Sequence, residues 1–195
     1  MYELKEKEMI FVFTGPNGAG RRTVADMSGS TLGVKQVISY TTRPPRANEV
    51  DGQDYHFLKP AQFFQAQQNG EFLEISEIDG NLYGVKSRDI EERFRSKGSI
   101  YLILNRYGAQ KLKELYGDHV VRIFIYADRR LVEQRFREKG YNEEQIAGFM
   151  SHFDEEMAYK DECEHAFENI DLAHTVFDLT KTLDKYLERN LLDLD

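Results

Sequence analysis

The stretch Gly15-Pro16-Asn17-Gly18-Ala19-Gly20-Arg21-Arg22-Thr23 decides the fold of this chain. It directly follows an apolar run at residues 9–13, which predicts a buried strand, and the residues after it predict a helix. A glycine-rich turn between a strand and a helix N-terminus points several backbone N–H groups at one spot, and the helix dipole adds partial positive charge. The stretch therefore predicts a site for a phosphate or a similar anion; a glycine-rich turn without a ligand is the alternative.

The end of this loop departs from the usual phosphate-binding loop. Such loops close with a Lys that lies on the terminal phosphates and a Ser or Thr that holds Mg²⁺. Arg21 keeps the positive charge in a planar guanidinium, and Arg22 has no oxygen to bind a cation. Thr23 lies roughly 100° further round the helix. Binding of a simple anion is therefore favoured over binding of ATP–Mg²⁺. The predicted phosphate loop consists of Gly15, Asn17, Gly18, Ala19, Gly20, Arg21, Arg22 and Thr23.

Composition narrows the class of protein. The 195 residues suit one domain, and the net charge of 26 − 34 = −8 argues against broad nucleic-acid binding. Cys163 is the single cysteine, and the five histidines lack metal-ligand spacing, so we expect no metal site and a reducing cytoplasmic location. The charged N-terminus has no signal-peptide core, and no apolar run reaches membrane-spanning length. We therefore expect no nucleic-acid or membrane partner.

Strand and helix patterns alternate along the chain. Alternation of this kind predicts an α/β fold with a mostly parallel sheet. A second group of short strand patterns predicts a small antiparallel insertion, and the charged segment 143–171 predicts helix on a mobile lobe, with residues 154–156 on a solvated face. The predicted core strands are 9–13, 36–40, 99–104 and 120–126, the helices are 21–27, 60–68, 107–115, 129–138 and 180–191, and the insertion strands are 55–58, 71–77 and 81–84.

A second set of motifs lies between the first and third core strands. The segments are SYTTRPPR at 39–46, EVDGQDYHF at 49–57, GEFLE at 70–74 and NLYG at 81–84. Two Arg and two Tyr can grip a phosphate through charge-assisted hydrogen bonds. A carboxylate such as Glu74 can accept two hydrogen bonds from the adjacent N–H groups of a guanine edge, and Ser39 can meet a carbonyl oxygen.

In this order and spacing, the motifs resemble those of the guanylate kinase family, from about residue 9 to residue 185. The resemblance implies a P-loop three-layer fold with a mostly parallel sheet, a small antiparallel GMP-binding insertion and a helical lid. It divides a single domain, 1–195, into a core (9–40, 99–140 and 172–195), an insertion (41–98) and a lid (141–171). In that family ATP binds the P-loop, GMP binds the insertion, and a phosphoryl group passes between them.

The resemblance is nearly complete in the GMP half. Ser39 and Glu74 match the positions that read guanine. The positions that hold the GMP phosphate match as well, in Arg43, Arg46, Tyr55 and Tyr83. Asn105 replaces the second Asp of a strand-end D-x-D motif and keeps an oxygen that can accept a hydrogen bond, which completes the predicted GMP-binding set. Val85 stands where the family usually has Ser or Thr.

The ATP half of the resemblance is degraded. The phosphate loop, with Arg21 and Arg22, is a degenerate form of the family's Walker A motif. Ile103 replaces the first Asp of D-x-D, and Phe149 replaces a lid Arg. Arg135 matches another lid Arg, so Arg21 and Arg135 are the candidate catalytic residues. Loss of one charge-neutralising group typically costs about 10²–10³ in rate. We therefore expect binding of GMP or a related guanine nucleotide with phosphoryl transfer weak or lost, as in a pseudoenzyme.

Two alternatives stay open. One is a divergent but active guanylate kinase, which converts ATP and GMP to ADP and GDP; ATP and Mg²⁺ are cofactors only in that case. The other is a module that binds a phosphorylated protein partner through the former GMP site, as the related domains of membrane-associated guanylate kinase scaffolds do. Glu74, a guanine-reading group, speaks against the second alternative.

Overall fold

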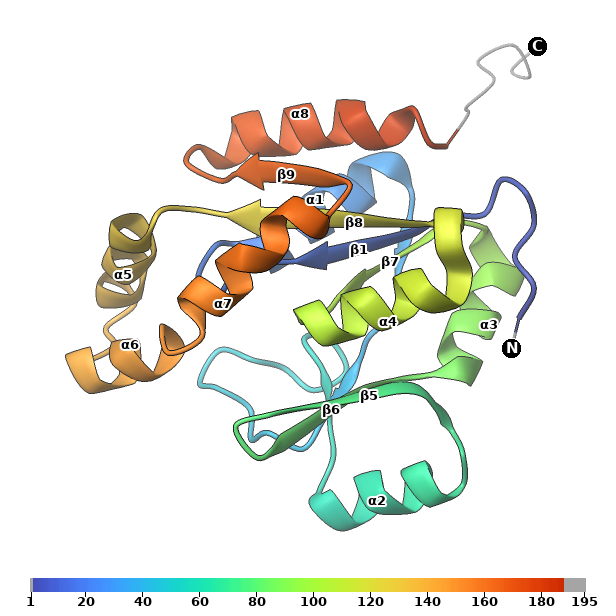
Figure 1. The fold of residues 1–195 in the computed structure, drawn as a ribbon, viewed down its shortest axis with the longest axis horizontal. Coiled ribbons are helices and arrows are strands. Elements are labelled where there is room, and N and C mark those ends of the chain that lie inside the picture. The colour runs from blue at the N-terminus through green and yellow to red at the C-terminus, as the bar shows by residue number, and fades with distance from the viewer. Residues whose placement is uncertain (1, 188–195) are drawn as a thin grey trace.

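A parallel sheet forms the centre of the computed structural model, which describes residues 2–187 (Figure 1). Its strands run in the order β2-β7-β1-β8-β9, and each pairs with its neighbours in parallel. The strand after the N-terminal segment therefore lies in the middle of the sheet. The bounds are β1 Ile10–Thr14, β2 Lys35–Gln36, β7 Ile100–Ile103, β8 Val120–Tyr126 and β9 His165–Glu168.

Helices cover both faces of this sheet, as the alternation of side chains along β1 requires. Phe11 and Phe13 pack into a core shared with α1 (Arg21–Leu32) and α8 (Leu172–Asp184). Ile10 and Val12 face the other way, toward α3 (Ser87–Lys97) and α4 (Arg106–Tyr116). The predicted α/β fold with a mostly parallel sheet is confirmed, in three layers.

A second sheet, which carries the sequence motifs, lies below the central one in Figure 1. Its order is β4-β3-β6-β5; β3 pairs with β4 in parallel and with β6 in antiparallel, so the sheet is mixed rather than purely antiparallel. Phe63 of α2 stacks on Phe72 at 4.3 Å between ring centroids, which fixes that helix to the sheet. The bounds are β3 Tyr40–Thr41, β4 His56–Phe57, α2 Pro60–Gln68, β5 Phe72–Ile78 and β6 Asn81–Lys86.

The segment 141–171, expected to form the lid and called the lid below, contains α6 (Glu143–Phe149) and α7 (Phe153–Ala158). Helix α5 (Arg129–Glu138) precedes it, and α5 and α6 lie at the left of Figure 1. These helices share a hydrophobic cluster of their own, built around Val132, Phe136 and Ile146. Short 3-10 turns follow α4 (Gly117–His119) and α7 (Tyr159–Glu162). The chain then returns to the central sheet as β9.

Four expectations need correction. Residues 36–40 do not form one strand, because β2 and β3 belong to different sheets. The last helix is Leu172–Asp184 rather than 180–191, and the end of the expected range lies outside the described residues. Segment 143–171 is not all helix, since it contains β9. Helix α3 had no counterpart among the expected elements.

No helix within residues 2–187 is long and apolar enough to cross a membrane.

Candidate nucleotide-binding cleft

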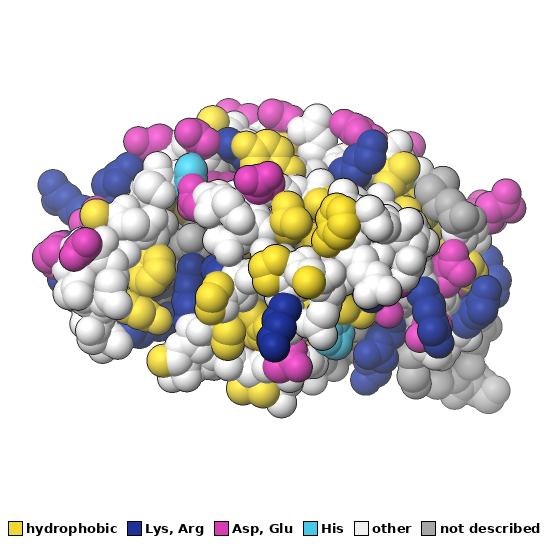
Figure 2. Space-filling view, turned by 90° about the horizontal axis from the view of Figure 1, so that it is seen from below, with side chains coloured by type: hydrophobic (Ala, Val, Ile, Leu, Met, Phe, Trp, Pro, Cys, Tyr) yellow, Lys and Arg dark blue, Asp and Glu magenta, His cyan; other side chains and the backbone are white. Residues whose placement is uncertain are grey.

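A cavity of about 460 Å³ lies where the phosphate loop, the insertion and the lid meet. Seen from below, Lys and Arg side chains (dark blue) lie in the recess between the lid end of the molecule and its middle (Figure 2). The cavity therefore joins segments far apart in sequence, and both cationic and acidic side chains line it. Its lining includes Gly15, Asn17, Gly18, Gly20, Arg21, Arg22, Thr23, Ser39, Arg43, Arg46, Tyr55, Glu74, Tyr83 and Asn105.

The backbone of the phosphate loop has the conformation that its glycines predict. Gly15 has φ +129°, and a Cβ there would lie 2.0 Å from the carbonyl oxygen of Ile125. Gly20 has φ +88°, and a Cβ there would lie 2.5 Å from Nδ2 of Asn169. That Nδ2 donates to the Ala19 carbonyl at 2.8 Å, so the residue that follows β9 stabilises the loop. Only glycine fits both positions.

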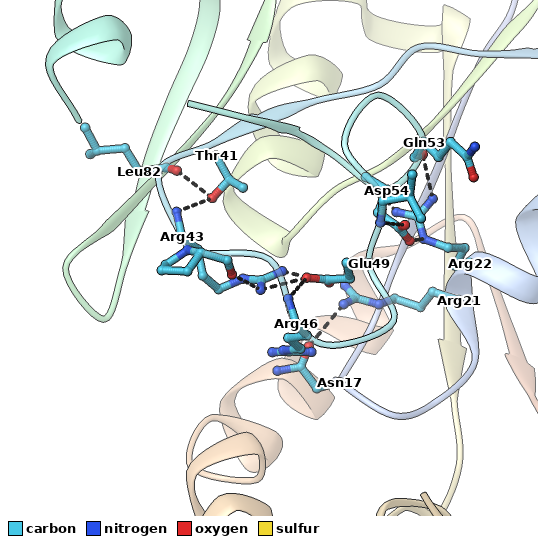
Figure 3. A network of polar contacts seen from close by, with 12 residues as sticks. Asn17, Arg21, Arg22, Thr41, Arg43, Arg46, Glu49, Gln53, Asp54 and Leu82 are labelled. Carbon is cyan, nitrogen blue, oxygen red and sulfur yellow. Dashed lines mark hydrogen bonds and ion pairs between the residues drawn. The ribbon is translucent and has the colours of Figure 1, made fainter. Parts of the chain in front are cut away.

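The two arginines at the start of α1 diverge (Figure 3). Arg21 stays at the loop, where its Nη2 donates to Oδ1 of Asn17 at 3.3 Å. Arg22 reaches the insertion, with its Nε 2.8 Å from Oδ1 of Asp54. The next residue, Thr23, is exposed. The two adjacent positive charges therefore serve different parts of the cleft.

The predicted GMP-phosphate residues form one polar cluster. Arg43 makes a bidentate pair with Glu49, at 2.9 Å and 2.8 Å, and its guanidinium lies 5.6 Å from the centre of the Tyr55 ring. Burial opposes the charge of Arg43, but its hydrogen bonds to Glu49 outweigh that and raise its pKa. The rings of Tyr55 and Tyr83 meet edge to face at 6.0 Å. Burial raises the pKa of Tyr83, which keeps its hydroxyl a donor for an anion.

Glu74 is a buried carboxyl at the opposite wall of the same cleft. It is 7% exposed, and burial raises its pKa from 4.5 to about 7. It lies against the first turn of α4, where a Cβ on Gly108 would be 3.2 Å from its Oε1. The N-terminus of a helix favours negative charge, so α4 stabilises the ionised form of Glu74. A ligand that donates hydrogen bonds to this carboxylate would stabilise the ionised form further. Ser39, also buried, lines the same cavity.

The residues after β7 are less available than their sequence positions suggest. Oδ1 of Asn105 accepts from the backbone N–H of Gly108 at 2.9 Å and caps α4, and its Nδ2 donates to Oγ of Ser76. Ile103 is an apolar, 8% exposed side chain at the cavity wall. The side chain of Asn105 is therefore used to cap α4, the helix against which Glu74 packs.

The lid contacts the insertion across the mouth of the cleft. The guanidinium of Arg46 lies 4.6 Å from the centre of the Phe149 ring, and Nε2 of His152 lies 2.8 Å from Oδ1 of Asp79. The hydrogen bond to Asp79 raises the pKa of His152. Glu156 turns into the cavity instead of lying on a solvated face, and burial raises its pKa. The expectation for residues 154–156 was therefore wrong at Glu156.

The residues of the loop fit phosphate and do not fit a protein-bound Mg²⁺. Mg²⁺ prefers oxygen ligands, which neither the Arg22 guanidinium nor the Ile103 side chain supplies. Among residues 2–187, no group of three or more His, Cys, Asp or Glu side chains is placed to hold a metal ion. Backbone N–H groups and Arg21 remain as the loop's means of binding an anion.

Comparison with known proteins identifies the family. The guanylate kinase family model matches residues 7–186. This chain belongs to the guanylate kinase family. The guanylate kinase of Nitrosomonas europaea is 34% identical over 138 residues, which cover 70% of this chain and 69% of that protein. The guanylate kinase of Methylobacillus flagellatus is 29% identical over 175 residues, 89% of this chain and 87% of that protein.

A solved structure supports the same fold for this family member. The crystal structure of guanylate kinase from Anaplasma phagocytophilum matches with a TM-score of 0.72 at 24% identity. The match covers 96% of this chain and 90% of that chain. The arrangement of sheets and helices described above is therefore a fold that a solved guanylate kinase shares.

Not every predicted site residue of this family member reaches the cavity. Ala19 and Arg135 are absent from its described lining. Nη1 of Arg135 donates to the Ala19 carbonyl at 3.5 Å and Nη2 to the Asn169 carbonyl at 2.5 Å, so Arg135 supports the loop from behind. Sequence reasoning missed Asp79, His152 and Glu156 as parts of the cleft. No local motif marks them, because they meet only when the lid folds over the insertion.

Proposed function

We propose that this chain binds GMP, with the guanine at Ser39 and Glu74 and the phosphate at the cluster of Arg43, Arg46, Tyr55 and Tyr83. One observation carries the proposal: a buried carboxyl and a cluster of cationic and phenolic groups line the same cavity. Guanine offers two adjacent N–H donors to a carboxylate, while the 5′-phosphate needs cationic and hydroxyl partners. GMP supplies both ends.

We also propose that the phosphate loop binds the phosphates of ATP and that transfer of the terminal phosphoryl group to GMP is weak or lost. Phosphoryl transfer depends on neutralising charge and on placing the metal. At this loop Arg22 is paired with Asp54 instead of offering a metal ligand, and Ile103 offers no oxygen at the strand end. Each missing group costs about 10²–10³ in rate, although such losses do not simply add.

A second candidate is ordinary guanylate kinase turnover, from ATP and GMP to ADP and GDP. The relatives named guanylate kinase, and the family match over residues 7–186, favour it. Arg21 retains a positive charge at the loop, which also supports it. The phosphopeptide alternative has less support, because buried Glu74 would face such a ligand without a donor.

Two measurements test these functions separately. Calorimetric titration with GMP is expected to give saturable binding, and AMP is expected to bind much more weakly because adenine lacks the N1–H donor. Absence of GMP binding at millimolar concentration would refute the proposal. A coupled assay with ATP, Mg²⁺ and GMP then decides between weak and ordinary turnover: a kcat of at least about 10 s⁻¹, the typical enzyme value, supports the second candidate.

A further inference from the structure

Arg22 connects the first turn of α1 to one loop of the insertion. Its Nε lies 2.8 Å from Oδ1 of Asp54, its Nη2 donates to the Asp54 carbonyl at 2.8 Å, and its Nη1 donates to the Gln53 carbonyl at 3.2 Å. Figure 3 shows the guanidinium directed at this loop and away from Asn17. All three kinds of guanidinium nitrogen are thus used on two neighbouring residues.

The loop that Arg22 holds is a compact turn in its own right. Oδ2 of Asp54 accepts from the backbone N–H of Val50 at 2.8 Å, and the N–H of Gly52 donates to the Tyr55 carbonyl at 2.8 Å. Asp54 is therefore held on one carboxylate oxygen by its own loop and on the other by Arg22. A shift of Asp54 would therefore move the backbone of the adjacent residue, Tyr55.

Tyr55 is the point at which this loop enters the proposed GMP-phosphate cluster. Its ring lies against the guanidinium of Arg43 and meets the ring of Tyr83 edge to face. The ion pair and hydrogen bonds of Arg22 go to Gln53 and Asp54 rather than to these side chains, so an effect on them passes through residues 53–55. The planar fork of arginine suits this role, because it can bind a carboxylate and two carbonyls of one turn at once.

We propose that Arg22 is a positioning residue that ties the phosphate-loop helix to residues 53–55 and thereby holds Tyr55 in place for the GMP phosphate. The inference rests on the proposed GMP binding. It gives Arg22 a role at the proposed GMP site, although in the sequence Arg22 belongs to the phosphate loop, the proposed ATP site. In this chain the side chain of Arg22 therefore connects the phosphate loop directly to the proposed GMP site.

The obvious rival is that Arg22 is a cation for nucleotide phosphates. The variant Asp54→Asn separates the two ideas, because its amide oxygen can still accept from Val50 while the ion pair is lost. On the rival view, removing a negative charge and releasing Arg22 strengthens GMP binding. On our view, the same change loosens Tyr55 and weakens it. The two ideas thus predict opposite signs for one substitution.

The test is calorimetric titration of GMP into the full chain, Asp54→Asn, Arg22→Met and the double variant. Loss of a partly exposed ion pair of this kind is expected to raise the Kd of GMP by about 2- to 5-fold in each single variant, and the double variant is expected to be no worse than either. Arg22→Lys, which keeps the charge, is expected to recover part of the affinity. The control is Arg93→Met on the exposed surface of α3, with an unchanged Kd.

The readings of this experiment separate its possible failures. Tighter GMP binding in Asp54→Asn, or unchanged binding in both single variants, would overturn the positioning role while leaving the proposed function intact. No GMP binding by the parent chain would refute the proposed function itself. Each variant is also melted without ligand: a structural role alone lowers the melting temperature and weakens ATP and GMP binding together, whereas a positioning role weakens GMP binding selectively.

Discussion

Glu74 makes GMP binding depend on pH in a way that can be worked out from its surroundings. Burial raises its pKa to about 7, and only the ionised carboxyl accepts both guanine N–H donors. With this pKa, about one molecule in eleven is ionised at pH 6 and about ten in eleven at pH 8. Ionisation of Glu74 alone is therefore expected to lower the Kd of GMP about 10-fold between pH 6 and pH 8, as measured by calorimetric titration.

The matched control for this titration is Glu74→Gln. The GMP phosphate has its own pKa near 6, which contributes about a twofold change over the same range. In Glu74→Gln that twofold change is expected to remain and the larger one to disappear, while binding at pH 8 is weakened because the amide repels one guanine N–H. A parent chain whose Kd changes no more than that of Glu74→Gln would refute the reasoning.

The same carboxyl affects the stability of the ligand-free protein. Because its folded pKa, about 7, is above its ordinary value of 4.5, the folded chain holds the proton more tightly than the unfolded chain. Its contribution to stability is present below pH 4.5 and is lost as pH rises through 7. The loss amounts to at most about 3 kcal/mol. Glu74→Gln is therefore expected to raise the free energy of unfolding at pH 8 and to change it little at pH 4.5, measured with urea.

Three further predictions concern the loop and the lid. Arg21→Lys combined with Arg22→Ser is expected to raise kcat at saturating GMP at least about 10-fold, because an ammonium and a metal-binding hydroxyl return to the loop; an unchanged kcat would mean that the arginines do not limit transfer. Gly15→Ala is expected to cost more than about 2 kcal/mol in urea unfolding, because its Cβ would lie 2.0 Å from the Ile125 carbonyl oxygen. A urea unfolding midpoint equal to that of the parent chain would contradict the predicted clash at Gly15. Phe149→Ala removes the ring under an arginine of the phosphate cluster and is expected to weaken GMP binding about 2- to 5-fold; equal Kd values in titration would assign the ring to packing alone.

Much of the fold follows from local patterns. Strand β8 and helices α2 and α5 have the bounds that their residues predict, because each is a long apolar run or a helix with a clear start. The pattern fails where tertiary pairing decides. Residues 36–40 cross from one sheet to the other, and β9 is an edge strand whose polar residues His165 and Glu168 hide its place in the sheet. The start of α8 depends on the cap from Asp171, whose side chain accepts from the N–H of His174.

The site divides in the same way. The residues predicted to bind GMP stand in fixed motifs, which is why the sequence reveals them, and the structure places Ser39, Glu74 and Tyr83 in one cavity. The spacing of a motif does not reveal what a long side chain touches. Arg22 is a loop residue by position, but its partner is 32 residues away in the insertion. Such contacts depend on how the insertion packs against the phosphate-loop helix, which no single segment of sequence reveals.

The order of strands in the central sheet has a consequence for the synthesis of the protein. Strand β1 lies between β7 and β8, and Ile10 pairs with Ile100 and Val120. At the usual rate of translation, the ninety residues between Ile10 and Ile100 take about 5 to 20 s to make. During that time strand β1, which precedes the phosphate loop, has neither of its two sheet partners. The phosphate loop is made before β7 and β8, but the strand that carries it is completed only after both of them.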